Sequence, residues 1–221
     1  MTIAALIDKY DNYELVRNEI AAILLAETSS QQALATAEGK DPTLWAFDVY
    51  LERFNPWERY INDRTEKTPI VNVWYDSDTT DLGASELISR QKHDGIFHID
   101  CYGRGISRSD GGAGHVPGDR DAVLEAQRVT RLVRNIIMSS TYTYLNMQGV
   151  VWRRYVQNRM IFQPSDNQRP VQQVMAGRLT LAVEYNETSP QYEGDTLELI
   201  SAEVSRADDG KVYFTAEYDV T

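Results

Sequence analysis

The chain has 221 residues, and its 42% hydrophobic and 10% aromatic content is enough to pack one sizeable domain, which excludes wholesale disorder. No run approaches the roughly 18–20 apolar residues of a membrane span, and the single cysteine, Cys101, excludes an intrachain disulfide framework. The net charge of −11 argues against a dedicated nucleic-acid binder, because contacts to phosphates require a concentrated basic surface.

Residues 1–67 are predicted to form a mainly helical N-terminal part. Apolar residues over 11–26 recur at three- and four-residue steps, which is typical of a helix with one buried face. A second, weaker helical stretch is expected over 28–39, where a glycine ends it. A third helix is expected over 41–55, because an aspartate followed by a proline marks its start and Asn-Pro marks its end.

Residues 68–186 are predicted to form a β-β-α-β-β core. The first strand is TPIVNVWY, the polar segment 76–86 follows as a loop, and GIFHIDCYGRG is a second strand with one apolar and one mixed face. After a glycine-rich loop, an amphipathic pattern predicts a long helix over 119–144. VVWRRYVQNRMIF and VMAGRLTLAVEYN are the last two strands of this core.

Residues 195–221 are predicted to form an acidic β-hairpin. LELISAEVS and KVYFTAEYDV have strand character, and Asp-Asp-Gly between them is a turn signal. The predicted fold class is therefore α+β, as one domain over 1–221. A mixed or antiparallel sheet of four or more strands packs on a long central helix, with a helical N-terminal region and an extra C-terminal β-hairpin.

Two clusters of metal-ligand residue types do not have the spacing of a metal site. His98 and Cys101, three residues apart in a strand, point to opposite faces and cannot converge on one zinc ion. The aspartates of DSDTTDLGASE resemble a calcium loop, but Asp81 and Leu87 stand where an EF-hand has glycine and glutamate. The sequence therefore predicts no metal and no cofactor.

The glycine-rich segment 103–114 lacks the spacing of a phosphate-binding loop, and no lysine follows it. We therefore expect no enzymatic activity. The alternative is a small hydrolase or nucleotide-binding enzyme whose site lies around His98, Asp100, Arg104 and His115.

Charge is distributed unevenly along the chain. Residues 184–221 carry ten acidic and two basic residues, whereas residues 68–183 carry eleven acidic and thirteen basic ones. Such a division suits head-to-tail self-association, and arginine favours bidentate pairing with carboxylates. A solvated, solubilising surface is the alternative explanation. The candidate subunit-interface residues are Arg128, Arg131, Arg134, Arg153, Arg154, Glu198, Glu203, Asp208 and Asp209, and the candidate partner-binding loop residues are Arg104, Arg108 and His115.

The element order resembles the tail-terminator, or tail-completion, proteins of long-tailed bacteriophages. The segments that carry the resemblance are YELVRNEIAAILLAE, TPIVNVWYD, HDGIFHIDCYGRG, DAVLEAQRVTRLVRNIIM, VVWRRYVQNRMIF and VMAGRLTLAVEYNE. Two features depart from a minimal family member: the insertion around 28–67 is longer, and the hairpin after Asp195 is additional.

The resemblance implies a non-enzymatic ring, typically a hexamer, that caps the tail tube, ends its polymerisation and presents a docking surface to the head or neck. The implied partners are other copies of the chain, the tail-tube protein, a head–tail connector or neck protein and, in a contractile tail, the sheath. No membrane partner is expected, and nucleic acid would only pass through the ring lumen. The implied location is the virion tail or neck, after assembly in the host cytoplasm. The alternative within virions is another connector, neck or baseplate component.

Overall fold

A mixed five-stranded sheet is the framework of residues 1–189, the first of two compact units into which the chain divides; the second is 190–221. The computed structural model describes residues 8–63, 65–81, 83, 90–109, 114–166, 169–170, 173–188, 199–205 and 212–219. The fold class is α+β, as predicted. The strands, in their order across the sheet, are β1 (Asp48–Leu51), β2 (Ile70–Thr80), β3 (Arg90–Arg104), β9 (Val174–Thr188) and β6 (Val151–Phe162).

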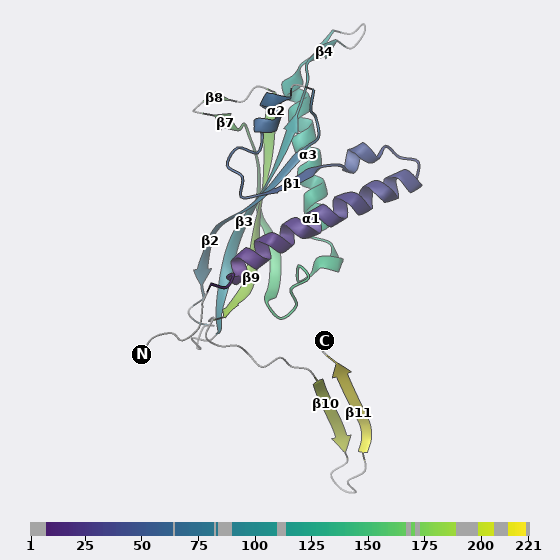
Figure 1. The fold of residues 1–221 in the computed structure, drawn as a ribbon, viewed down its shortest axis with the longest axis vertical. Coiled ribbons are helices and arrows are strands. Elements are labelled where there is room, and N and C mark those ends of the chain that lie inside the picture. The colour runs from purple at the N-terminus through teal and green to yellow at the C-terminus, as the bar shows by residue number, and fades with distance from the viewer. Residues whose placement is uncertain are drawn as a thin grey trace. The chain divides into compact units, whose positions relative to one another are not determined.

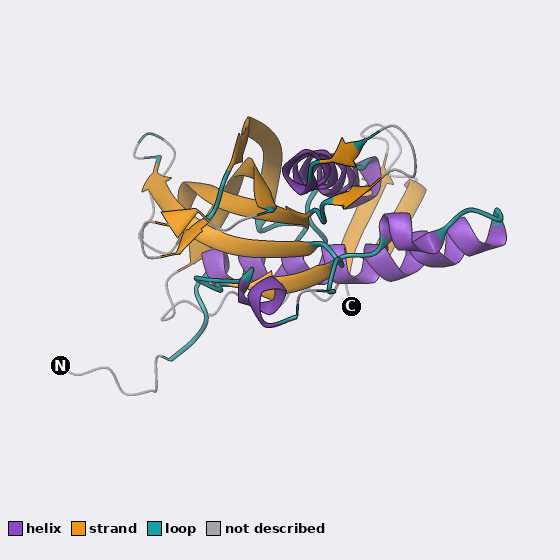
Figure 2. Ribbon diagram, turned by 90° about the horizontal axis from the view of Figure 1, so that it is seen from above, coloured by secondary structure: helices purple, strands orange, loops and turns teal. Residues whose placement is uncertain are grey.

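The sheet is mixed because β1 runs parallel to β2, whereas all other neighbouring strands are antiparallel. Helices α1 (Asn12–Ala37) and α3 (Gly118–Ile137) pack on the same face. In Figure 1, α1 runs obliquely across the strands and α3 lies along them. The C-terminal half of α1 continues past the strands, where the helix packs on the 3-10 turn η1 (Pro42–Trp45) (Figures 1 and 2).

The main core lies between this face and the two helices. In β3, Phe97, Ile99 and Cys101 are fully buried and face the helices, as the predicted alternation requires. Val16 and Ile20 of α1 are likewise fully buried and complete the same cluster. The opposite face of the sheet therefore carries His98, Asp100 and Tyr102 of β3, a set with hydrogen-bonding capacity.

Two glycines allow the end of β3 to approach the first turns of α3. A Cβ atom on Gly103 would lie 2.4 Å from the backbone nitrogen of Ala126, and one on Gly105 would lie 1.8 Å from the carbonyl oxygen of Gly118. Because the opposing atoms belong to the backbone, no side-chain rotation could relieve these contacts. The close approach of helix and strand thus depends on glycine at these positions.

The N-terminal region differs from the prediction in two respects. The helices expected over 11–26 and 28–39 are one continuous helix, α1, because the hydroxyl of Thr28 is buried and donates to the carbonyl of Trp45 instead of interrupting the helix. The helix expected over 41–55 is wrong. There η1 is followed by β1, which pairs with β2 from Asp48↔Ile70 to Leu51↔Val73. The short helix α2 (Glu58–Asn62) then precedes β2.

Smaller differences lie in the core. Strand β2 extends to Thr80, into the segment expected as a loop, because it stays paired with β3 as far as His93. Helix α3 ends at Ile137 and not near Tyr144, and the 3-10 turn η2 (Ser140–Tyr142) follows. The remaining short strands form two pairs: β4 (Arg108–Ser109) with β5 (His115–Val116), and β7 (Ser165–Asp166) with β8 (Arg169–Pro170).

The second unit contains strands β10 (Leu199–Ser205) and β11 (Val212–Asp219), which pair antiparallel with an irregularity at Val204/Ser205. Of the acidic interface candidates, Glu203 lies in β10. Glu198, Asp208 and Asp209 lie outside the described residues, as does the predicted turn.

Candidate functional site

Arg154 is committed to contacts within its own subunit. Its guanidinium donates to the carbonyls of Ile137 (2.6 Å), Ser139 (2.7 Å) and Thr143. These carbonyls end α3 and form the turn after it, so Arg154 caps the helix from the neighbouring strand β6. Burial holds the pKa of Arg154 below its ordinary value. This interface candidate therefore uses three of its five N–H donors within its own subunit.

Arg128 and Arg153 also have partners within the subunit. Arg128 pairs with Glu125 on α3, donates to the carbonyl of Leu44 in η1, and has a side chain only 18% exposed. Arg153 pairs with Glu184, which also contacts Lys92 at 3.0 Å. Burial would raise the pKa of Glu184, but hydrogen bonds from Lys92 and Arg153 outweigh it and hold the pKa below its ordinary value. The Arg153 side chain remains 70% exposed and accessible to a neighbour.

Arg131, Arg134 and Arg159 differ from the preceding arginines. Across the described part of the chain, none of the three has a carboxylate partner; Arg134 contacts only the side chain of Asn135. Arg131 on α3 and Arg159 on β6 line one shallow groove of about 310 Å³. The other lining residues are Gln127, Thr130, Met160 and Ile161. Arg131 and Arg134, two of the predicted interface residues, and Arg159, which was not among them, are therefore available for an acidic partner.

The groove borders an open edge of the sheet. Strand β6 is hydrogen-bonded only to β9 within the five-stranded sheet, so its other side lacks a strand partner there. Its large apolar side chains are unusually exposed, at 40–54%: Trp152, Tyr155, Met160 and Ile161. Long, exposed, apolar edge strands are usually protected in soluble proteins because they bind other chains. The edge is therefore suited to intermolecular contact.

The loop candidates have separate roles. Arg104 donates to the carbonyls of Asp63 (2.6 Å) and Glu66 (3.0 Å), and its guanidinium lies 5.7 Å from the ring centre of Tyr60. Arg108 pairs with Asp121 at 3.2 Å while remaining 59% exposed. His115 lies in β5, of which only the backbone is described. Arg104 thus has a structural role, and Arg108 is the accessible member of the set.

Glu66, whose carbonyl Arg104 binds, should contribute less to the free energy of unfolding in acid. Arg59 donates to Glu66 at 2.6 Å and holds the pKa of Glu66 at about 2. Because the folded pKa lies below the unfolded value of about 4.3, this contribution is present above that value and is lost as the pH falls toward 2. Glu66→Gln should therefore cost more unfolding free energy at pH 7 than at pH 3 in urea titrations. An equal cost at both pH values would contradict the assignment.

The opposite face of the sheet contains a buried ion pair that the sequence analysis did not single out. Asp100, with a side chain 3% exposed, accepts from the Nε (2.7 Å) and Nη2 (2.9 Å) of Arg178 and from the Nε1 of Trp74 (3.1 Å). The Arg178 guanidinium lies between the rings of Trp74 (4.8 Å) and Phe162 (5.2 Å). The bonds to Asp100 raise the pKa of Arg178. Only the strand register, in which Asp100 pairs with Arg178, could have identified this contact.

A pocket of about 430 Å³ lies beside this ion pair, with Trp57, Trp74 and Phe162 in its wall. The rings of His98 and Trp74 are in tilted contact with their centres 4.6 Å apart, and burial lowers the pKa of His98. Of the four residues of the enzymatic alternative, His98 and Asp100 therefore share one face, whereas the Arg104 guanidinium binds the carbonyls of residues 63 and 66.

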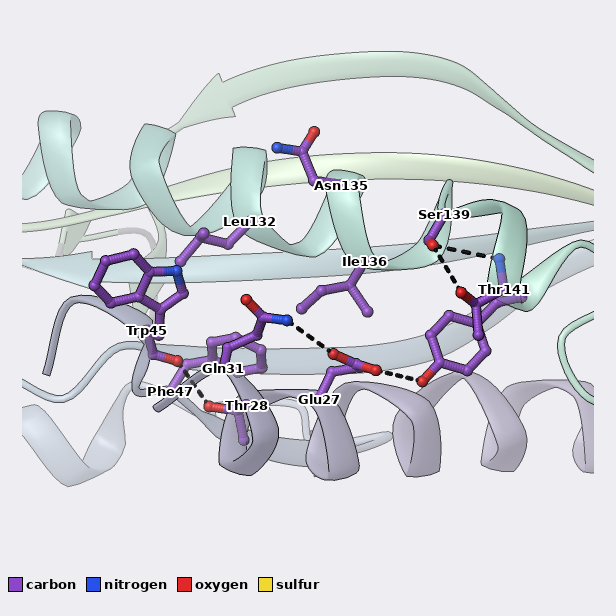
Figure 3. A pocket seen from close by; sticks show the side chains of 11 residues that line it. Glu27, Thr28, Gln31, Trp45, Phe47, Leu132, Asn135, Ile136, Ser139 and Thr141 are labelled. Atoms are coloured by element: carbon purple, nitrogen blue, oxygen red, sulfur yellow. Dashed lines mark hydrogen bonds between the residues drawn. The ribbon is translucent and has the colours of Figure 1, made fainter. Parts of the chain in front are cut away.

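A second pocket, of about 390 Å³, separates α1 from α3 (Figure 3). Its wall combines an apolar set, Trp45, Phe47, Leu132 and Ile136, with a polar set, Glu27, Thr28, Gln31, Asn135, Ser139, Thr141 and Tyr142. Glu27 accepts from the hydroxyl of Tyr142 (2.5 Å) and the amide of Gln31 (3.2 Å) (Figure 3). The bond to Glu27 raises the pKa of Tyr142 to about 12. Within the described ranges no cationic side chain pairs with Glu27, so its charge is open to one from outside.

No family model and no curated protein matches this chain. In the part of the chain that the structure describes, no three or more His, Cys, Asp or Glu side chains are grouped to hold a metal ion. None of its described helices is long and apolar enough to span a membrane. The open β6 edge with its unpaired arginines and the two pockets are therefore the candidate functional features.

Proposed function

We propose that the protein is a tail terminator of a long-tailed bacteriophage. In this proposal a ring of copies, a hexamer by the family resemblance, caps the finished tail tube, stops its polymerisation and presents a docking surface to the head–tail connector or neck. The protein assembles in the host cytoplasm, acts in the virion and has no enzymatic activity. In a contractile tail the ring also contacts the sheath.

The observation that carries the proposal is the open edge of β6, beside which lie Arg131 and Arg159, two arginines with no carboxylate partner among the described residues. A closed ring needs two different, complementary surfaces on each subunit. Residues 190–221 carry eight acidic and two basic residues, so their net charge is opposite to that of the arginines in the groove. The ring contact is proposed to join this acidic C-terminal hairpin of one copy to the arginine-bearing groove of the next.

The finer architecture belongs to the same proposal. Helix α3 is the long central helix of the terminator core, β2, β3, β6 and β9 are its four core strands, and β10 with β11 forms the appended hairpin. A two-stranded hairpin alone is at best marginally stable in water, so contact with a neighbouring copy would also stabilise it. The additional strand β1 extends the core at its other edge.

Reversing the free cations should weaken assembly. We expect Arg131→Glu with Arg159→Glu to reduce self-association at least tenfold in sedimentation equilibrium, because like charges would then face each other across the contact. Arg120→Glu is the matched control, since Arg120 is an exposed residue of the same helix outside the groove. Equal association of the two variants would contradict the proposed contact.

The function itself is tested on growing tubes. Substoichiometric protein added to polymerising tail-tube protein should stop elongation, and negative-stain images should place a ring at one tube end. Self-association should weaken as salt screens the contact. A salt-indifferent monomer that leaves tubes growing and binds nucleotide or metal would overturn the proposal in favour of the enzymatic alternative.

A further inference from the structure

A large apolar side chain projects at the end of β1. Phe54 is 91% exposed, and Leu51, three residues earlier, is 42% exposed. Single exposed apolar residues are common on protein surfaces and need no explanation by themselves. The backbone that presents Phe54 does need an explanation, because several hydrogen bonds hold it in a costly conformation.

Glu52 takes the left-handed backbone conformation, with φ of +50°, which is unfavourable for a residue with a side chain. Its backbone nitrogen donates to the carbonyl of Val73 at 3.0 Å. Its carboxylate accepts from the backbone nitrogen of Tyr75 (3.1 Å) and from Arg17 (3.0 Å). These contacts hold the turn that directs the next two residues out of the sheet.

The side chain of Asn72 holds the backbone of Arg53, the residue that follows Glu52. Asn72 is only 3% exposed. Its side-chain oxygen accepts from the backbone nitrogen of Arg53 at 3.1 Å, and its side-chain nitrogen donates to the carbonyl of Arg53 at 2.9 Å. The Arg53 guanidinium lies over the ring of Tyr50 and 3.9 Å from Glu58, with a side chain 43% exposed. Arg53 and Phe54 therefore form a pre-organised cationic and aromatic projection, which we name the knob.

The pocket between α1 and α3 has the complementary chemistry (Figure 3). Phe47 and Ile136 give it an apolar wall, and they are only 4% and 9% exposed. The Glu27 carboxylate has further acceptor capacity beyond its bonds to Tyr142 and Gln31. The pocket has a volume of about 390 Å³, which lies in the range of pockets that accept side chains or small ligands.

We propose that the knob of one copy inserts into this pocket of a second copy. The Phe54 ring packs on the apolar wall and the Arg53 guanidinium pairs with Glu27. The two surfaces are distinct on each subunit: Phe54 borders the pocket of Trp74 and Arg178 on the face away from the helices, whereas the receiving pocket lies between the helices. Such a contact is head-to-tail, which is the kind that closes rings, and in this respect the inference rests on the proposed function.

A cross-linking experiment tests the contact directly. Proteins carrying Asn55→Cys and Asn135→Cys, one substitution each, are mixed under mild oxidation, so that the Phe54 ring stays in place; Asn55 directly follows Phe54, and Asn135 is an exposed residue of the pocket wall. The native Cys101 is fully buried and burial raises its pKa, so its thiol stays unreactive. The mixture should form the disulfide-linked dimer at least ten times faster than a control mixture of Asn55→Cys with Gln157→Cys. Equal rates would overturn the proposal.

Substitutions provide an independent readout. Phe54→Ala should weaken self-association at least tenfold, whereas Ile61→Ala, which removes another exposed apolar side chain, should leave it unchanged. Arg53→Glu and Glu27→Arg should each weaken association, and the double variant should restore it. Failure of that rescue together with full association of Phe54→Ala would overturn the knob.

The outcomes separate this inference from the proposed function. One outcome is a ring that caps tubes and dissociates with Arg131→Glu and Arg159→Glu but is unchanged by Phe54→Ala. That outcome would support the tail-terminator function and contradict the knob contact. A selective cross-link between positions 55 and 135 in a protein that never stops tube growth would support the knob contact and contradict the tail-terminator function.

Discussion

Asp100→Ala is expected to lower the free energy of unfolding by about 3–5 kcal/mol, because breaking a buried ion pair leaves its partner without compensation. Asp100 accepts four hydrogen bonds, two from Arg178, one from Trp74 and one from the hydroxyl of Tyr102. After the substitution, the Arg178 guanidinium would remain between Trp74 and Phe162 with only 25% of its side chain exposed. Chemical denaturation measures the loss, and Trp74 fluorescence should change in the same variant.

Asp100→Asn is the matched control for this prediction. The amide keeps an oxygen for one bond to Arg178 and nearly the same volume, so its loss should be smaller than that of Asp100→Ala. A destabilisation by alanine below about 1 kcal/mol, the net value of an ordinary hydrogen bond, would show that Arg178 finds water or another acceptor. The ion pair would then contribute little to holding β3 against β9.

Arg154→Met is expected to lower the free energy of unfolding by about 3 kcal/mol, because hydrogen bonds from a charged donor are worth about 1.5–3 kcal/mol each. Methionine keeps much of the side-chain length but donates nothing to the carbonyls of Ile137, Ser139 and Thr143. These carbonyls would have to bind water or remain unsatisfied at the end of α3. Denaturation followed by circular dichroism measures both the stability and the helix content.

Arg154→Lys separates the cap from a purely electrostatic role. Lysine keeps the positive charge but lacks the planar fork, so it should recover only part of the lost stability. Arg131 and Arg159 should behave differently: reversing their charge should weaken self-association but leave the free energy of unfolding almost unaltered. If Arg154→Lys restored full stability, the three-carbonyl cap would not be the basis of the effect.

Local sequence determines the elements on which the arginines lie, but it does not determine what they bind. Their helical and strand positions were predictable from periodicity, but their partners were not. Arg154 binds the end of α3 across seventeen residues of chain, and Arg178 binds Asp100 across seventy-eight. Such contacts depend on strand register and helix placement, which a single sequence does not encode in any short pattern.

The wrong helix over 41–55 has the same origin. Asp41 does accept from the backbone nitrogen of Thr43 at 3.0 Å, so the predicted start signal is present locally. The segment nevertheless continues as β1, because its residues Asp48–Leu51 pair with the open edge of β2. Hydrogen bonding and packing along a pre-existing sheet outweighed a weak local preference for helix.

The sequence by itself determined the α+β class, the positions of the four core strands and the amphipathic helix before β6, because burial of one face imposes periods of 2 and 3.6 on neighbouring residues. Only the tertiary structure decided which of the described arginines lack a carboxylate partner, where β1 joins the sheet, and that the Asn72 side chain holds the backbone of Arg53 in place. Those features arise from contacts between residues distant in the chain. Their energies depend on geometry, and composition and spacing do not record that geometry.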